Sequence, residues 1–196
     1  MQQEFLKLLR SLLRGELSRT RRRTNRSPWA IGGLVIAIVG VSYFLYEPKA
    51  PPATTPKGAE LTCTVNSVYD GDTLTARCSV GEVKVRMFGI DAPEMGQKPW
   101  GHAAKQALQG LLPDRGIRLQ VQDQDRYGRT VAQVWVDDRD VGLEMVKKGW
   151  AVMYEQYNNS PAYRQAQNEA KQSRRGIWEK SGSQQDPAAW RRLNPR

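Results

Sequence analysis

The chain has 196 residues, and its thirty Lys and Arg against twenty Asp and Glu give a formal net charge of +10. This length suits one ordinary domain with additional segments, and a hydrophobic content of 39% excludes both a wholly disordered chain and a multi-span membrane protein. One histidine, His102, and two cysteines exclude zinc fingers and histidine-rich metal sites. A basic chain suits a nucleic acid or an anionic membrane as partner, so the position of the charge matters.

Most of the excess charge lies in the basic segment 1–28, which has eight Lys and Arg against two Glu. Residues 58–196, the part long enough to fold, hold twenty basic and seventeen acidic residues. Apolar residues recur at helical spacing within 5–17, which fits an amphipathic helix on the inner leaflet of a membrane. A mitochondrial presequence has a similar pattern, and the residues do not separate the two.

Residues 29–46 form an eighteen-residue segment without a charge, with Trp29 at one end and Tyr43 and Tyr46 at the other. As a helix it would be roughly 27 Å long, close to the hydrocarbon thickness of a bilayer, with aromatic residues at both interfaces. A buried core helix and a cleaved signal peptide are the alternatives, but the long basic segment before it favours an uncleaved signal anchor. The positive-inside rule then keeps the N-terminus cytoplasmic and places everything after Tyr46 on the exported, periplasmic or extracellular, side.

A proline-rich linker, 47–58, follows the predicted span and contains four prolines, so we expect it to be extended. The predicted folded domain is 59–180, and the remaining 181–196 form a polar C-terminal tail. Within this tail we expect Trp190 to dock onto the domain and Arg191 and Arg192 to be solvated.

The sequence of the domain predicts five short strands and three helices. The strands are expected at 61–69, 73–79, 83–90, 117–124 and 130–136, and the helices at 101–112, 141–148 and about 160–174. Turn signals at Asp70-Gly71 and around Gly128 separate neighbouring strands, and Ser160-Pro161 suits a helix start. The prediction is an α+β fold, a five-stranded Greek-key β-barrel with about three packed helices, preceded by a single transmembrane helix.

The two cysteines provide a test of the first hairpin. If the chain turns about Asp70-Gly71, residues that face each other have numbers summing to about 141, which pairs Cys63 with Cys78. Facing cysteines on adjacent strands are within disulfide reach, and an exported domain would allow the bond. We therefore predict an intrachain Cys63–Cys78 disulfide, with two buried free thiols as the alternative.

Carboxylates gather near the expected ends of two strands. Asp70 and Asp72 lie at the first turn, and Asp91 and Glu94 follow the third strand. If the second and third strands pair, Asp72 and Asp91 lie at the same end of the hairpin, where their charges repel unless a cation is present. Oxygen ligands without His or Cys favour a hard ion, Ca²⁺ or Mg²⁺. Alone, the Asp-Gly-Asp sequence would be ordinary turn chemistry.

Three motifs follow one another along the chain: V-x-D-G-D-T at 68–73, V-R-x-x-G-I-D-A-P-E at 85–94 and D-R-Y-G-R at 125–129. Together they resemble the staphylococcal nuclease-like, or thermonuclease, family. The likeness covers about residues 60–180 in order and ends at Gly176-Ile177-Trp178. Each motif alone is weak, but three at suitable spacing are specific. The resemblance implies an OB-fold endonuclease that hydrolyses phosphodiester bonds of DNA, RNA or both with Ca²⁺.

Carried over by position, the resemblance implies that Asp72 and Asp91 bind Ca²⁺ through their carboxylates. Ala92 would contribute its backbone carbonyl, where family members often have Thr; a main-chain ligand atom tolerates that change. Glu94 would be the general base that acts on the attacking water, a role debated for the family.

The resemblance also implies that Arg86 and Arg129 bind the phosphate. Planar guanidinium groups donate paired hydrogen bonds to two phosphate oxygens, and two positive charges offset the charge that grows on the pentacovalent transition state. Tyr127 matches one nucleotide-stacking position of the family, whereas Tyr154 and Tyr157 surround the other without a clear choice.

The leading hypothesis is therefore a membrane-anchored, Ca²⁺-dependent nuclease with a monomeric catalytic domain. A non-catalytic nucleic-acid-binding OB domain is the first rival, because degenerate relatives of this fold bind without cutting. A barrel that serves only as an assembly scaffold is the second. The sequence does not decide between DNA and RNA as substrate.

Overall fold

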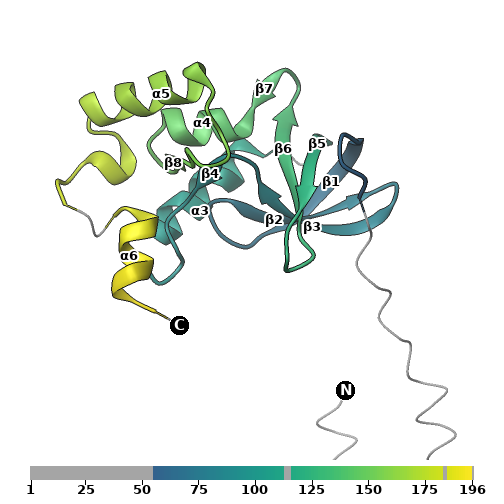
Figure 1. Ribbon diagram of the computed structural model, residues 1–196, viewed down its shortest axis with the longest axis horizontal. Helices are drawn as coiled ribbons and strands as arrows, with labels where there is room; N and C mark the ends of the chain where they lie inside the picture. Colours follow the sequence, from purple (N-terminus) through teal and green to yellow (C-terminus); the bar gives the residue numbers. More distant parts are fainter. Residues whose placement is uncertain (1–54, 113–115, 183–184, 196) are drawn as a thin grey trace, which may run out of the picture. The chain divides into compact units, whose positions relative to one another are not determined.

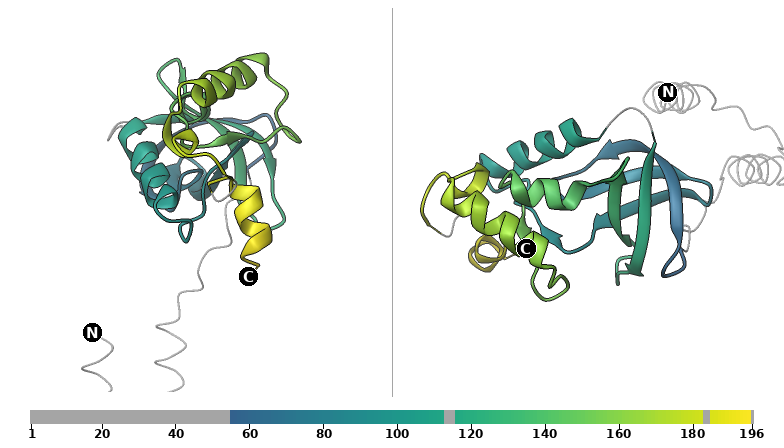
Figure 2. Two further views of the ribbon diagram at one scale, coloured as in Figure 1. Left: turned by 90° about the vertical axis from the view of Figure 1, so that its left-hand side faces the viewer. Right: turned by 90° about the horizontal axis from the view of Figure 1, so that it is seen from above.

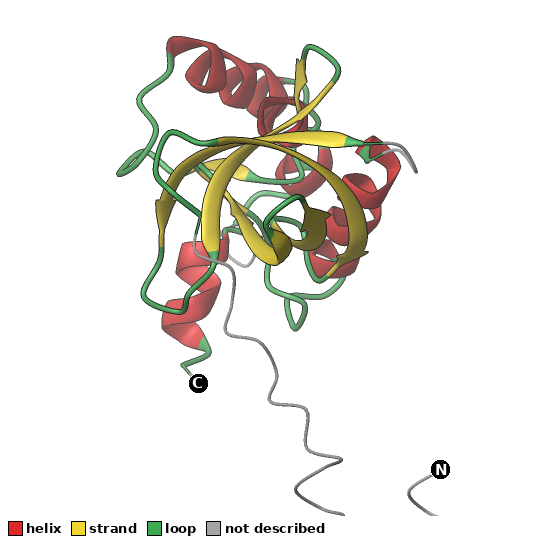
Figure 3. Cartoon of the chain, turned by 90° about the vertical axis from the view of Figure 1, so that its right-hand side faces the viewer, coloured by secondary structure: helices red, strands yellow, loops and turns green. Residues whose placement is uncertain are grey.

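Five strands close into a barrel in a computed structural model that describes residues 55–112, 116–182 and 185–195. They are β1 (Glu60–Val68), β2 (Thr73–Cys78), β3 (Gly81–Met87), β5 (Ile117–Gln124) and β6 (Thr130–Val136). Neighbours pair in the order β3-β2-β1-β5-β6, and a parallel pairing of β3 with β6 closes the ring. Figure 3 shows these strands curving around a common interior. The arrangement confirms the expected five-stranded barrel and is consistent with an OB fold.

The barrel interior follows from the alternation of side chains along each strand. Every second residue of β6 is buried, from Thr130 through Ala132 and Val134 to Val136, and Ile117, Leu119 and Val121 of β5 are buried in the same way. Because successive side chains of a strand point to opposite faces, each strand contributes one apolar row to the core. The alternating buried residues of these strands therefore fill the barrel.

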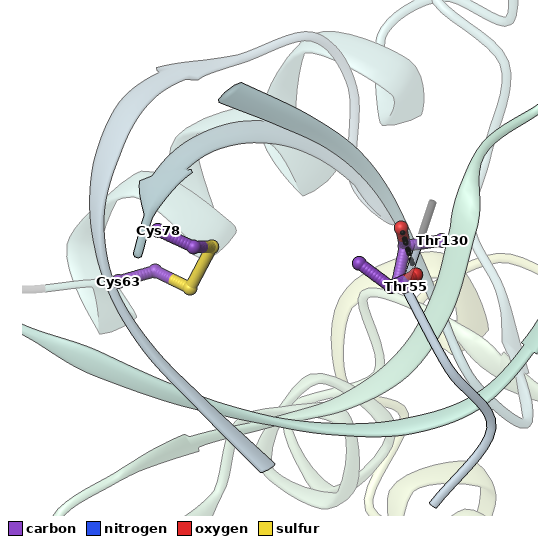
Figure 4. Close-up of a disulfide and its surroundings, with 4 residues drawn as sticks. All are labelled: Thr55, Cys63, Cys78 and Thr130. Atoms are coloured by element: carbon purple, nitrogen blue, oxygen red, sulfur yellow. Dashed lines mark hydrogen bonds between the residues drawn. A yellow bond between two sulfur atoms is a disulfide. The ribbon is translucent and has the colours of Figure 1, made fainter. Parts of the chain in front are cut away.

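The first hairpin has the predicted register. Cys63 pairs with Cys78, and the two form a disulfide, as expected from a turn about Asp70-Gly71. The register shifts by one residue between Val65 and Ser67, so a bulge lies between the disulfide and the turn. In the chain-entropy model a cross-link around a loop of this size contributes roughly 3 kcal/mol. Figure 4 shows the disulfide across the ring of strands from a hydrogen bond between the Thr55 and Thr130 hydroxyl groups, whose oxygens are 2.8 Å apart.

Helices gather at one end of the barrel (Figures 1 and 2). They are α3 (Trp100–Leu111), α4 (Val141–Lys147), α5 (Pro161–Gln172), the 3₁₀ helix η1 (Gly176–Trp178) and α6 (Pro187–Leu193). Asp140 caps α4 by accepting hydrogen bonds from the backbone N–H groups of Gly142 and Leu143, and its other oxygen accepts one from the Tyr163 hydroxyl of α5. This shared carboxylate joins the two helices over the barrel end.

Several short elements were not predicted. β4 (Ile90–Asp91) pairs with β8 (Val152–Met153), and β7 (Arg139–Asp140) pairs antiparallel with the end of β6. Helix α6 lies in the segment expected to be a polar tail. The last residues of the expected linker lie on the barrel, where Thr55 is buried and the backbone N–H of Gly58 donates to the carbonyl of Val121.

The predicted signal anchor, 29–46, and the basic segment before it lie outside the described residues. Across 55–112, 116–182 and 185–195, no helix has both the length and the apolar character needed to cross a membrane.

Candidate active site

The barrel strands bring three of the predicted site residues together. Asp72 directly precedes β2, whose first residue pairs with Arg86 of β3, and Asp91 ends the short strand β4 that follows β3. An Nη atom of Arg86 lies 3.3 Å from Oδ2 of Asp72 and 3.6 Å from Oδ1 of Asp91. The guanidinium therefore bridges the two carboxylates at one end of the hairpin.

Backbone geometry holds the Asp72 carboxylate in place. Its Oδ2 accepts a hydrogen bond from the backbone N–H of Ala92 at 2.8 Å, and its Oδ1 accepts one from the Thr73 hydroxyl at 3.0 Å. The preceding Gly71 allows the close approach, because a Cβ there would lie 2.7 Å from the Cβ of Ala92. Glycine in the Asp-Gly-Asp turn thus has a packing role as well as a turn role.

Burial makes both carboxyl groups of this pair less acidic than usual. Asp72 is 6% exposed and Asp91 is 4% exposed. Burial raises the pKa of Asp72 to about 6 against the lowering effect of Arg86, and the neighbouring Asp70 raises it further. Burial also raises the pKa of Asp91, against a hydrogen bond from Arg191, and repulsion from Asp72 adds to the rise. Keeping both carboxylates ionised in this buried place costs free energy, and additional positive charge nearby would lower that cost.

This cost predicts a pH-dependent stability for an Asp72→Asn variant. A carboxyl whose pKa is raised on folding stabilises the fold below its unfolded pKa, and this contribution is lost as the pH rises through about 6. Relative to the wild type, metal-free Asp72→Asn should therefore gain on the order of 2–3 kcal/mol in unfolding free energy between about pH 4 and 7. Urea denaturation in a chelator at several pH values measures the difference, and a difference independent of pH would contradict it.

Glu94 lies in a loop anchored by a buried glutamine. The backbone N–H of Glu94 donates to Oε1 of Gln97 at 3.1 Å, and the N–H of Gln97 donates to the carbonyl of Glu94 at 2.8 Å. Gln97 is buried, and the start of α3 packs so closely that a Cβ on Gly101 would lie 2.1 Å from the Glu94 carbonyl oxygen. The loop therefore holds the Glu94 backbone rigidly while its carboxylate remains partly accessible.

A second arginine, which the sequence patterns did not indicate, joins this group from the C-terminal helix. Both Nη atoms of Arg191 donate to Asp91, at 3.1 Å and 2.6 Å, and Nη1 also donates to Oε1 of Glu94 at 3.1 Å. The hydrogen bond to Asp91 raises the pKa of Arg191 above its ordinary value, so the group stays charged. The expectation that Arg191 is solvated is therefore wrong, whereas Arg192 is exposed as expected.

Arg129 lies near Arg86 but pairs with a different carboxylate. Its neighbour Thr130 is the first residue of β6 and pairs with Val85, and Val131 pairs with Arg86. Arg129 therefore lies just before β6, diagonally across from Arg86 of the adjacent strand. Its Nε–H donates to Oδ2 of Asp125 at 2.7 Å. Burial acts to raise the pKa of Asp125, but hydrogen bonds from the Arg129 backbone and side chain lower it below its ordinary value.

The three predicted stacking tyrosines are all exposed, in two separate places. Tyr127 lies beside the guanidinium of Arg129, which is 5.6 Å from its ring centroid. Tyr154 and Tyr157 contact each other edge to face, with ring centroids 5.0 Å apart. Tyr154, and not Tyr157, lines a cavity of about 310 Å³ that also includes Asp91. Tyr154 therefore shares a cavity with Asp91, whereas Asp72, Arg86 and Glu94 do not line this cavity.

The residues at the site are compatible with a hard divalent ion. Among the described residues, no three Asp, Glu, His or Cys side chains are grouped so that they alone could hold a metal. The implied set needs only the carboxylates of Asp72 and Asp91, with backbone carbonyl and water oxygens completing the shell. Two buried carboxylates with raised pKa values, already neutralised in part by guanidinium groups, are a donor set that a cation would stabilise.

The fold and the site together describe an OB-fold-like barrel that carries buried carboxylates bridged by an arginine at one end of the β2–β3 hairpin. Residues 84–180 match the family described as staphylococcal nuclease homologue. An uncharacterized endonuclease of Haemophilus influenzae is 40% identical over 132 residues, which cover 67% of this chain and 73% of the relative. Protein ParB of Escherichia coli is 35% identical over 148 residues, covering 70% and 82%. The chain therefore belongs to the staphylococcal nuclease family.

Proposed function

We propose that this chain is a Ca²⁺-dependent nuclease that hydrolyses phosphodiester bonds of DNA, RNA or both. The observation that carries the proposal is the buried pair Asp72 and Asp91 bridged by Arg86, in a member of this family. A stable barrel needs no such pair, because burying two carboxylates together is costly. In a site that binds a metal ion, the cation would offset the cost of burying the two carboxylates, and Arg86 could bind the phosphate.

The proposed chemistry assigns separate tasks to three side chains. Glu94 accepts a proton from the water that attacks phosphorus, while Arg86 and Arg129 donate hydrogen bonds to the phosphoryl oxygens. Asp125 occupies Nε of Arg129, so an end-on contact through both Nη groups suits the phosphate. Arg86 lies on β3 and Arg129 directly precedes β6, the strand that pairs with β3, so the barrel keeps both arginines in position as charge develops.

Calcium held by Asp72, Asp91 and the carbonyl of Ala92 would add positive charge at the phosphate and lower the pKa of a bound water. The chain positions these groups through β2 and β4 and through the hydrogen bond from Ala92 to Asp72. Tyr127 and Tyr154 are the exposed rings suited to stack against bases on either side of the scissile bond.

The proposal includes a membrane anchor at 29–46 and an exported, monomeric catalytic domain. The Cys63–Cys78 disulfide supports export, because such bonds persist mainly in oxidising compartments. The basic segment 1–28 would then remain cytoplasmic.

Incubation of the purified full-length chain with plasmid DNA and with RNA tests the proposal. We expect degradation in Ca²⁺ and none in excess EGTA, with activity restored when Ca²⁺ is added back. Binding without degradation under both conditions would favour the non-catalytic OB domain, and neither binding nor degradation would favour the scaffold.

A further inference from the structure

Helix α6 places the positively charged guanidinium group of Arg191 in the carboxylate site. We propose that Arg191 is a built-in competitor for the metal ion: it occupies Asp91 and Glu94 in the metal-free protein and is displaced when the ion binds. This inference rests on the proposed function and adds a form of regulation to the same site. The C-terminal helix would then set the metal concentration at which the enzyme becomes active.

The geometry of the contact is that of a competitor. Arg191 contacts both oxygens of Asp91 with its two Nη groups, in the paired arrangement typical of strong arginine–carboxylate interactions. The third bond, from Nη1 to Glu94, links the proposed metal ligand to the proposed base. With Arg191 in place, the carboxylate that would bind the ion is already paired through both its oxygens.

Helix α6 is docked in a defined position. Asp186 accepts a hydrogen bond from the backbone N–H of Ala189 at 2.7 Å, and Pro187 occupies the first turn, so the helix has a specified start. Ala189 is buried, and the ring of Trp190 packs against the loop that carries Glu94: a Cβ on Gly96 would lie 3.2 Å from it. Arg191 follows directly, and its hydrogen bonds to Asp91 place α6 beside β4. Figure 1 shows α6 at the end of the domain where the helices gather.

The contacts at the site favour exchange over joint occupancy. Arg191 donates to both oxygens of Asp91, the carboxylate that would bind the ion, and to Oε1 of Glu94. An ion bound at Asp91 would lie next to the guanidinium, and the two positive charges would repel each other. The Arg191 side chain is 40% exposed and Asp91 only 6%, so the arginine has solvent to move into and the aspartate does not.

Calcium titration of two matched variants of the full-length chain tests the inference. Arg191→Gln removes the competing charge, while Arg192→Gln removes the same charge from the exposed neighbour on the same helix. By calorimetry, Arg191→Gln should bind Ca²⁺ about tenfold more tightly than the wild type. Arg192→Gln should stay within about twofold, because exposed charges contribute little.

Thermal unfolding supplies a second readout. Without metal, Arg191→Gln should unfold at a lower temperature, because Asp91 loses its main partner; Ca²⁺ should then raise its melting temperature more than that of the wild type. Equal or weaker Ca²⁺ affinity in Arg191→Gln would overturn the inference. If the wild type still degrades nucleic acid in Ca²⁺ in that case, the proposed function stands; if no protein binds Ca²⁺ and none degrades nucleic acid, both fail.

Discussion

Replacing Arg129 by lysine is expected to lower kcat for nucleic-acid hydrolysis by about 10²–10³-fold while KM changes by less than about threefold. Lysine keeps the positive charge, so electrostatic attraction of the substrate persists. It cannot donate two parallel hydrogen bonds to phosphoryl oxygens as charge grows on them in the transition state. Steady-state kinetics on a defined oligonucleotide separates the two constants.

Arg126→Lys provides the matched control for this experiment. Arg126 lies in the same turn, and its guanidinium also lies near the ring of Tyr127, 5.0 Å from the centroid, but it is exposed. Its replacement should leave both constants nearly unchanged. Because Arg129 also pairs with Asp125, the melting temperature of each variant is measured alongside. A rise in KM with kcat retained in Arg129→Lys would assign Arg129 to ground-state binding instead.

Replacing Glu94 by glutamine is expected to lower kcat by about 10²–10⁴-fold, the range typical of a lost general base. Glutamine preserves the length of the side chain and still accepts a hydrogen bond from Arg191, so the loop should remain in place. Affinity for Ca²⁺ should stay within about tenfold, since the proposed metal ligands are Asp72, Asp91 and Ala92. Kinetics at saturating Ca²⁺ and calorimetric titration measure the two effects.

Glu155→Gln is the control for the Glu94 variant, because Glu155 is an exposed carboxylate that lines the same cavity as Asp91. It should retain wild-type kcat. Full activity of Glu94→Gln at saturating Ca²⁺ would remove Glu94 from the mechanism, and a large loss of Ca²⁺ affinity would identify it as a ligand instead of a base.

Local patterns were sufficient to predict the five strands. Turn signals at Asp70-Gly71 and around Gly128 separated neighbouring strands, and the Asp70-Gly71 turn was enough to place Cys63 opposite Cys78. The same reasoning placed Asp72 and Asp91 at one end of the β2–β3 hairpin. These features depend on residues within about thirty positions of each other, where turn chemistry and strand periodicity are informative.

Long-range contacts could not be predicted in the same way. Arg191 lies 100 residues from Asp91 along the chain, and no pattern in the sequence around Arg191 predicts a buried carboxylate as its partner. Asp186-Pro187 is a usable helix-start signal, and it was the one local feature that could have indicated α6. Strands β4 and β8 have only two residues each, too few for any periodicity, although their pairing holds Asp91 in place.

The roles of the tyrosines depend on the same kind of contact. Tyr154 and Tyr157 are three residues apart, and the sequence offered no reason to prefer either. The cavity that Tyr154 shares with Asp91 distinguishes them, because that cavity is formed by segments from β8, α5 and the start of α6. Stacking by Tyr154 stays a prediction that its replacement by alanine would test through KM.

The most direct measurement of the central claim is the rate of plasmid cleavage as a function of Ca²⁺ concentration, for the wild type and Asp91→Asn side by side. We expect saturable, EGTA-sensitive cleavage by the wild type. Asp91→Asn should require far more Ca²⁺ or show no cleavage, because half of the carboxylate pair is gone. Cleavage by both proteins with the same dependence on Ca²⁺, or cleavage that persists in EGTA, would contradict a Ca²⁺-dependent mechanism at this site.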